Sequence, residues 1–184
     1  MSAIRIAARM RRIKPSPSSA GTDRLAQLRR EGRDIVSLLI GEPDFDTPEP
    51  IRRAAIEAIE GGQTRYTQTA GTLALRQAIA AKFERENGLH YEPRDIIVTV
   101  GAKHAIFNAL SVSCEPGDEV IIPAPYWVSY PDMVLACDGT PVVVPCTEDD
   151  GFLLTPAALE AAITPATRWL ILNSPSNPTG AAYT

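Results

Sequence analysis

Two segments in the first half of the chain place apolar residues at the spacing of an amphipathic helix. In residues 51–59 the apolar positions recur at i, i+3, i+4, i+7 and i+8, and Gly61–Gly62 follows. Residues 75–83 carry a stripe of leucine, isoleucine and phenylalanine, and Asn87 and Gly88 follow. Because such a stripe covers one helical face and glycine commonly ends helices, both segments are predicted to be helices that end at these glycines.

The segment before these helices mixes prolines, serines and short apolar runs. The Pro/Ser-rich residues 14–19 predict a lid-like segment, and a short helix is expected around residues 22–31. A strand is expected at residues 35–40, where the side chains are mostly β-branched or leucine. Thr47 and Pro48 then predict a helix start, with the threonine as N-cap and the proline at the first helical position.

From residue 96 onward, short β-branched runs alternate with helical segments. Strands are expected at residues 96–100, 119–122, 142–144 and 168–172, with helices at 102–113, 128–136 and 156–163. Such alternation is typical of crossover units, so the fold class is α/β, with a mostly parallel sheet in a three-layer α/β/α arrangement. Since no helix follows to cover the last strand before Thr184, we expect an incomplete sheet and a chain that is a fragment.

Composition fits a packed globular protein and argues against nucleic acids and membranes as its partners. Of the 184 residues, 45% are hydrophobic and 22% are charged, which excludes disordered and collagen-like chains. The 18 basic and 22 acidic residues leave a net charge of −4, which argues against nucleic acid as a partner. The apolar runs are too short to cross a membrane and no signal peptide is recognisable, so a cytoplasmic protein without membrane contact is expected.

The cysteines and histidines give no indication of a metal site or of redox chemistry. Cys114, Cys137 and Cys146 are odd in number and lack CxxC spacing, and His90 and His104 are the only imidazoles. We therefore expect reduced, buried thiols and no metal site. The four arginines between residues 5 and 12 are expected to form a solvated helix face.

One candidate binding loop lies between an expected strand and an expected helix, where open parallel sheets bind ligands. Gly101, Ala102 and Lys103 open that helix, so backbone N–H groups and the helix dipole favour an anion such as phosphate. The alternative is a tight turn with a solvated lysine. The glycine patterns of dinucleotide and nucleoside-triphosphate sites are absent from the sequence.

Two further loops at the same expected edge of the sheet carry an aromatic ring and an amide. Trp127 offers a face for stacking on a planar ring, or else it is a partly buried core aromatic. Asn177 offers a hydrogen bond to a ring oxygen, or else it belongs to an ordinary Asn-Pro turn. Together the three loops favour a phosphorylated aromatic cofactor over a metal or a nucleotide.

Five motifs follow one another along the chain and resemble those of class I aminotransferases. They are GEPDFDTP at 41–48, RYTQTAG at 65–71, TVGAKHAIFNAL at 99–110, PGDEVIIPAPYWVSYP at 116–131 and NSPSNPTG at 173–180. The chain most resembles the prokaryotic aspartate aminotransferase subgroup, which includes prephenate aminotransferases. The resemblance covers nearly the whole chain from Lys14 onward.

The resemblance implies a homodimeric, pyridoxal-phosphate-dependent enzyme of fold type I. Residues 1–45 would form an N-terminal lid and small-domain segment, and residues 46–184 the first part of the cofactor-binding large domain. The implied reaction moves an amino group between an amino acid and a 2-oxo acid, with aspartate or another dicarboxylic amino acid as the expected substrate.

The motifs also imply roles for individual residues around the cofactor. Gly101, Ala102 and Lys103 match the loop that binds the cofactor phosphate. Trp127 matches the residue that stacks on the pyridine ring, and Asn177 matches the one that bonds its phenolic oxygen. Both are also expected to line the substrate site.

Four residues are implied for the phosphate of the partner subunit's cofactor and for the substrate. Tyr66 matches the tyrosine that reaches that phosphate, and Gly41 the glycine whose backbone meets the substrate α-carboxylate. Lys14 and Ser18, in the lid segment, are candidates for contact with the substrate's distal carboxylate. His104 stands where relatives commonly carry glutamine, and it either tunes the phosphate loop or is a half-buried surface histidine.

The Schiff-base lysine of the family has no match in this sequence. The lysines are Lys14, Lys82 and Lys103, and none occupies the corresponding motif. We therefore expect the 184-residue chain by itself to be inactive. Alternatives are a pyridoxal-phosphate-dependent lyase or aromatic aminotransferase of the same fold, a non-catalytic aminotransferase-like binding module, and a flavodoxin-like or Rossmann nucleotide binder.

Overall fold

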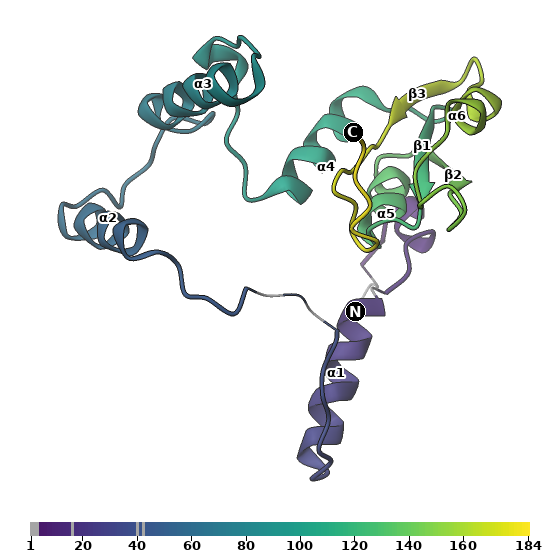
Figure 1. Ribbon diagram of the computed structural model, residues 1–184, viewed down its shortest axis with the longest axis horizontal. Helices are drawn as coiled ribbons and strands as arrows, with labels where there is room; N and C mark the ends of the chain where they lie inside the picture. The colour runs from purple at the N-terminus through teal and green to yellow at the C-terminus, as the bar shows by residue number, and fades with distance from the viewer. Residues whose placement is uncertain (1–3, 16, 40, 42) are drawn as a thin grey trace. The chain divides into compact units, whose positions relative to one another are not determined.

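Two compact units divide the chain in the computed structural model, which describes residues 4–15, 17–39, 41 and 43–184 (Figure 1). One unit joins Met1–Ile40 to Ile106–Thr184, and the other is Gly41–Ala105. Among the described residues, no helix combines the length and apolar character that a membrane crossing requires.

A parallel sheet of three strands forms the centre of the first unit. Its strands are β1 (Glu119–Ala124), β2 (Thr140–Pro145) and β3 (Thr167–Leu170), in the order β2-β1-β3. Val120, Ile121 and Ile122 of β1 are fully buried. Burial on both faces is what a central parallel strand requires. The expected strands at 119–122 and 142–144 are confirmed, as is the parallel α/β fold, whereas the strand expected at 168–172 ends at Leu170.

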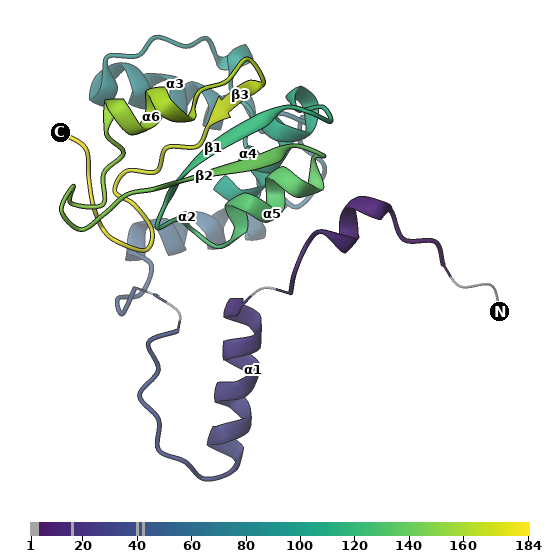
Figure 2. The same cartoon turned by 90° about the vertical axis from the view of Figure 1, so that its right-hand side faces the viewer.

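Helices pack on both faces of this sheet, which gives the three layers. Leu110 of α4 (Ala102–Ser113) and Val134 of α5 (Ser129–Ala136) form one buried cluster with Val120 and Ile122. Helix α6 (Pro156–Ala162) contacts β2 and lies on the opposite face of the sheet from α5 (Figure 2). Thr155 caps α6 by accepting a hydrogen bond from Ala158 N.

The N-terminal segment corrects two expectations. Helix α1 (Pro17–Arg30) begins five residues before the expected start at residue 22, because a proline is well suited to the first helical position. The expected strand at 35–40 is wrong for residues 35–39, which are irregular, and residue 40 lies outside the described residues. Val36 and Leu38 are 88% and 94% exposed, since no neighbouring strand pairs with them in the described structure.

Two of the N-terminal arginines, Arg9 and Arg12, are exposed as expected and also form ion pairs. Arg9 lies in η1 (Ala8–Arg11), a turn of 3₁₀ helix, and its Nη1 is 3.5 Å from Asp138 Oδ2. Arg12 binds the other oxygen of the same carboxylate. Arg12 also donates to Leu135 O of α5 at 3.2 Å. Asp138 and this carbonyl therefore hold the N-terminal turn against α5.

Replacement of Asp138 by asparagine tests this contact. Because both ion pairs are partly exposed, Asp138→Asn is expected to lower the free energy of unfolding by less than about 1 kcal/mol. The difference from the unsubstituted chain should shrink in about 1 M salt, where surface charges are screened. Urea denaturation at low and high salt measures it. Asp149→Asn, at an exposed position, is the matched control, and an equal loss in both variants would contradict the assignment.

The second unit contains α2 (Glu49–Glu60), α3 (Leu73–Asn87) and η2 (Pro93–Asp95). Both expected helices are confirmed, and Gly61 and Gly88 cap their ends. The expected start of the first helix is shifted, because Pro48 is the N-cap instead of the first helical residue. The Thr47 side chain therefore does not take the predicted N-cap role.

A single arginine connects the loop before α3 to η2. Arg76 donates hydrogen bonds to Gly71 O at 3.1 Å, Pro93 O at 2.8 Å and Gln68 Oε1 at 2.9 Å. These bonds fix the C-terminal half of the RYTQTAG motif. Since a guanidinium presents several donors in one plane, lysine is no substitute here.

The expected strand at residues 96–100 is wrong. In this segment Val98 N donates to Ala70 O at 2.9 Å, but the described residues form no ladder with another strand. Ile97 and Val100 are 69% and 89% exposed. A β-branched run forms a strand only where a neighbouring strand pairs with it through backbone hydrogen bonds. The sequence of the run does not identify that neighbouring strand.

Candidate functional site

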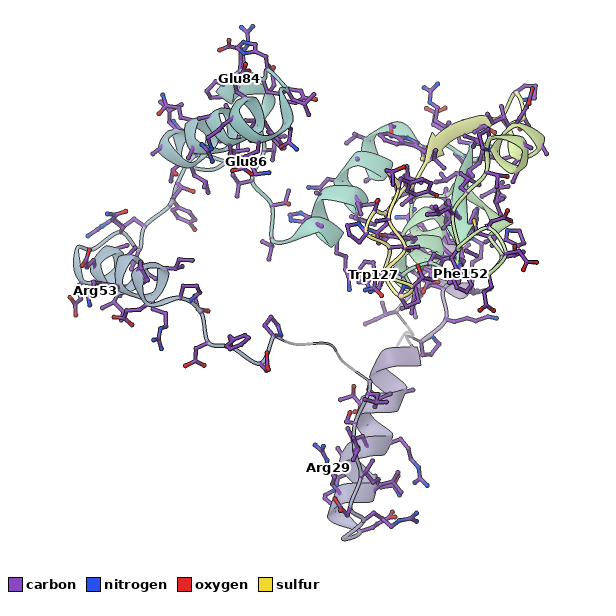
Figure 3. All side chains as sticks on the ribbon, viewed as in Figure 1. Arg29, Arg53, Glu84, Glu86, Trp127 and Phe152 are labelled. Carbon is purple, nitrogen blue, oxygen red and sulfur yellow. The ribbon has the colours of Figure 1, made fainter. Side chains whose placement is uncertain are left out.

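The loops that follow the three strands meet at the carboxyl end of the sheet. They enclose a cavity of about 20 Å³, lined by residues from all three loops, among them Tyr126, Phe152 and Asn173. Such a volume holds about one water molecule. Trp127 and Phe152 are drawn on two of these loops (Figure 3). The sheet therefore brings the Trp127 and Asn177 loops together, as expected for adjacent parallel strands.

Trp127 is half-buried at the edge of the hydrophobic core. Its ring meets that of Tyr130 edge to face, with the centroids 5.5 Å apart and the planes at 76°. Burial raises the pKa of the Tyr130 hydroxyl above its ordinary value. This contact orients the indole, as expected for a partly buried core aromatic. Trp127 is nevertheless only half-buried, so it also remains accessible for stacking on a planar ring.

Asn177 sits in a loop that is closed by its own hydrogen bonds. Asn177 N donates to Asn173 Oδ1 at 3.0 Å, and Gly180 N donates to Ser176 O at 2.8 Å. Ser176 N donates to Ala181 O at 2.8 Å. The Asn177 residue is exposed, whereas the backbone around it is held by these bonds.

Gly101, Ala102 and Lys103 belong to the second unit, at the N-terminus of the 12-residue helix α4. Gly101 has φ +81°, a backbone conformation that favours glycine, and a Cβ there would meet no atom within 4 Å. His104 N and Ala105 N donate to Gly101 O, so the backbone N–H groups of Ala102 and Lys103 lead the helix. Open space, a positive φ and leading N–H groups all suit a phosphate.

His104 closes the same loop from its other end. Its Nδ1 accepts a hydrogen bond from Val100 N at 3.3 Å, which links the residue before Gly101 to the first turn of α4. His104 is exposed, so the expected half-buried position is wrong. The contact is to the backbone of the candidate phosphate loop, and a side-chain amide oxygen could also accept this hydrogen bond.

Of the remaining candidates, Tyr66, Gly41 and Lys14 lie at exposed positions. Tyr66 and Gly41 are exposed residues of the second unit, and Lys14 is an exposed residue of the first. Ser18 lies within α1, and its side chain is outside the described part of the structure. Their expected roles remain predictions.

The cysteines are protonated thiols at neutral pH. Cys146 is buried, while Cys114 and Cys137 are only partly buried. Burial raises the pKa of all three thiols above the ordinary value, which disfavours the reactive thiolate. Within the described ranges, no three His, Cys, Asp or Glu side chains are grouped as metal ligands would be.

The sequence did not indicate the hydrogen bonds that Arg76 and Tyr183 make between loops. It also did not indicate the hydrogen bond between His104 and the backbone of Val100. Tyr183 accepts a hydrogen bond from Leu154 N at 2.7 Å, across 29 positions of the sequence. Arg76 reaches Pro93, 17 positions away. Neither pairing leaves a periodic or spaced pattern from which it is recognised.

Comparison with known proteins gives consistent matches along the chain. The family model described as "Aminotransferase class I and II" matches residues 33–184. An aspartate/prephenate aminotransferase of Cereibacter sphaeroides is 58% identical over 94% of this chain and 43% of its own length. A probable aspartate/prephenate aminotransferase of Rickettsia bellii is 54% identical over 97% of this chain and 45% of its own length.

Solved structures agree with these relatives. The aspartate aminotransferase of Rhizobium meliloti has a TM-score of 0.94 and 52% identity, over 99% of this chain and 46% of its own. That of Thermus thermophilus with maleate has a TM-score of 0.94 and 47% identity, over 99% and 48%. The chain thus spans less than half the length of the relatives it matches. It belongs to the aminotransferase class I and II family.

Proposed function

We propose that the whole protein transfers an amino group between an amino acid and a 2-oxo acid, with pyridoxal phosphate as cofactor. The observation that carries the proposal is the 58% identity to an aspartate/prephenate aminotransferase over 94% of the chain. It favours a dicarboxylic amino acid as substrate. An aromatic aminotransferase of Pyrococcus horikoshii is also similar, at 45% identity over 88% of this chain, so an aromatic amino acid is the second candidate.

The open loop at the start of α4 fits the phosphate of this cofactor, and the motif residues can be given roles around it. Gly101, Ala102 and Lys103 would hold the phosphate at the start of α4, where the helix dipole favours an anion. Trp127 would contact the ring face, and Asn177 would hydrogen-bond its phenolic oxygen. When bound, pyridoxal phosphate supplies a ring that accepts electrons from the substrate.

The remaining candidates have roles in substrate binding and assembly. Gly41 would meet the α-carboxylate through its backbone, while Lys14 and Ser18 would approach a distal carboxylate. Tyr66 would reach the cofactor phosphate of the partner in a homodimer; its full exposure leaves it accessible to a second subunit. We further propose a cytoplasmic protein with a boundary near residue 45 between a lid and small-domain segment and the large domain.

The positions of the three lysines bear on whether this chain contains the Schiff-base lysine. Lys14 is exposed near the N-terminus, Lys82 pairs with Glu86 at 3.2 Å on α3, and Lys103 opens α4. We propose that none of them takes the role of the Schiff-base lysine, and that the 184-residue chain alone does not turn over.

Single-turnover rates of the protein expressed from its complete gene test the function. Aspartate and glutamate are expected to convert the bound cofactor at least about tenfold faster than phenylalanine, because a charge-assisted hydrogen bond to the second carboxylate adds roughly 1.5–3 kcal/mol. The cofactor's absorbance follows the reaction, with arogenate as a further substrate. Equal slow rates with all substrates would contradict the dicarboxylate proposal, and turnover by the 184-residue chain would contradict its inactivity.

A further inference from the structure

Tyr183 connects two loops that leave different strands of the sheet. Its hydroxyl accepts a hydrogen bond from Leu154 N at 2.7 Å, between the loop that follows β3 and the turn that precedes α6. Tyr183 is 36% exposed and lines the small cavity at the carboxyl end of the sheet. Its hydroxyl therefore bridges the two loops at the surface of the sheet's edge.

The loop on the Tyr183 side is closed by hydrogen bonds among its own residues. Tyr183 N donates to Ser174 Oγ at 3.1 Å, and Asn177 N donates to Asn173 Oδ1 at 3.0 Å. With the bonds between Ser176 and its neighbours described above, these contacts close the loop from residue 173 to residue 183. Tyr183 and Asn177 thus belong to the same hydrogen-bonded loop.

The turn on the other side provides a firm anchor. Thr147 Oγ1 donates to Asp150 Oδ2 at 2.9 Å, and Phe152 N donates to Thr147 O at 2.8 Å. Leu153 N donates to Asp150 O at 3.2 Å, immediately before the Leu154 N–H that Tyr183 accepts. The donor is thus presented by a turn with its own hydrogen bonds.

We propose that Tyr183 is a positioning residue that holds the Asn177 loop against the turn before α6. Without the hydroxyl, the loop keeps its internal bonds but loses its attachment to residue 154. The consequence for cofactor binding rests on the proposed role of Asn177, whereas the attachment itself does not.

Amide hydrogen exchange tests the attachment in the protein expressed from its complete gene. In Tyr183→Phe the exchange of the Leu154 and Asn177 amides is expected to speed up about fivefold, the effect of losing one net hydrogen bond. Tyr91→Phe, which keeps its edge-to-face packing on Phe83, is the matched control and should leave both rates unchanged. Unchanged exchange of the Asn177 amide in Tyr183→Phe overturns the proposal.

A double-mutant cycle on pyridoxal phosphate affinity separates positioning from general destabilisation. Tyr183→Phe is expected to weaken affinity severalfold in the unsubstituted protein and to add nothing in an Asn177→Ala background. An equal loss in both backgrounds overturns action through Asn177. If the unsubstituted protein does not bind the cofactor, the proposed function fails, while the exchange experiment still decides the attachment.

Discussion

Substitution of Gly71 by alanine is expected to lower the free energy of unfolding by about 2–5 kcal/mol, the largest loss we predict for a single methyl group. Gly71 has φ +98°, where an L side chain costs about 1–2 kcal/mol. The new Cβ would lie 2.7 Å from Val98 Cγ2 and 2.9 Å from Val98 Cβ, and such overpacking costs about 1–3 kcal/mol more. Val98 N donates a hydrogen bond to Ala70 O, which hinders movement of Val98 away from the new Cβ.

The two costs are separable by experiment. Gly88→Ala, at φ +63° with no atom within 4 Å of its Cβ, should show the backbone cost alone. Adding Val98→Ala to Gly71→Ala should recover the steric part, relative to Val98→Ala by itself. Urea denaturation of the four variants gives the free energies. Equal losses for the Gly71 and Gly88 variants would rule out the contact with Val98.

The elements that could be predicted are those whose pattern is local. Helix α4 begins and ends at the expected residues, and α3 ends at Gly88, because apolar spacing and glycine caps act within a few residues. Strands β1, β2 and β3 were also predictable. β1 and β2 are short runs that each lie between two helical segments, and β3 follows a helical segment, an arrangement that itself indicates parallel pairing.

The rest depends on contacts between distant residues. The expected strands at 35–40 and 96–100 have the composition of strands, yet their described residues lack pairing partners, and composition does not reveal a partner. The motifs identified the Trp127 and Asn177 loops, which the sheet brings together. They did not reveal Tyr183 or Arg76, since the hydrogen bonds of these residues follow from the folded backbone.

Replacement of Gly101 by valine is expected to weaken pyridoxal phosphate binding at least about tenfold, if the loop before α4 holds the phosphate as proposed. Gly101 has φ +81°, which a β-branched residue avoids, so the variant should rotate the peptide that leads into Ala102. Loss of even one backbone N–H bond to a phosphate costs roughly 1.5–3 kcal/mol, or about ten- to a hundredfold in affinity.

Gly32→Val is the matched control for this variant, because the chain repeats the same local geometry away from the phosphate loop. Gly32 has φ +79°, and its Cβ, like that of Gly101, would meet no atom within 4 Å. Both variants should therefore lose similar stability, while only Gly101→Val loses affinity. Thermal unfolding and cofactor titration of the protein from its complete gene measure the two quantities. Equal losses of affinity would mean that backbone strain, not the phosphate loop, governs binding, and the assignment of Gly101 would fall.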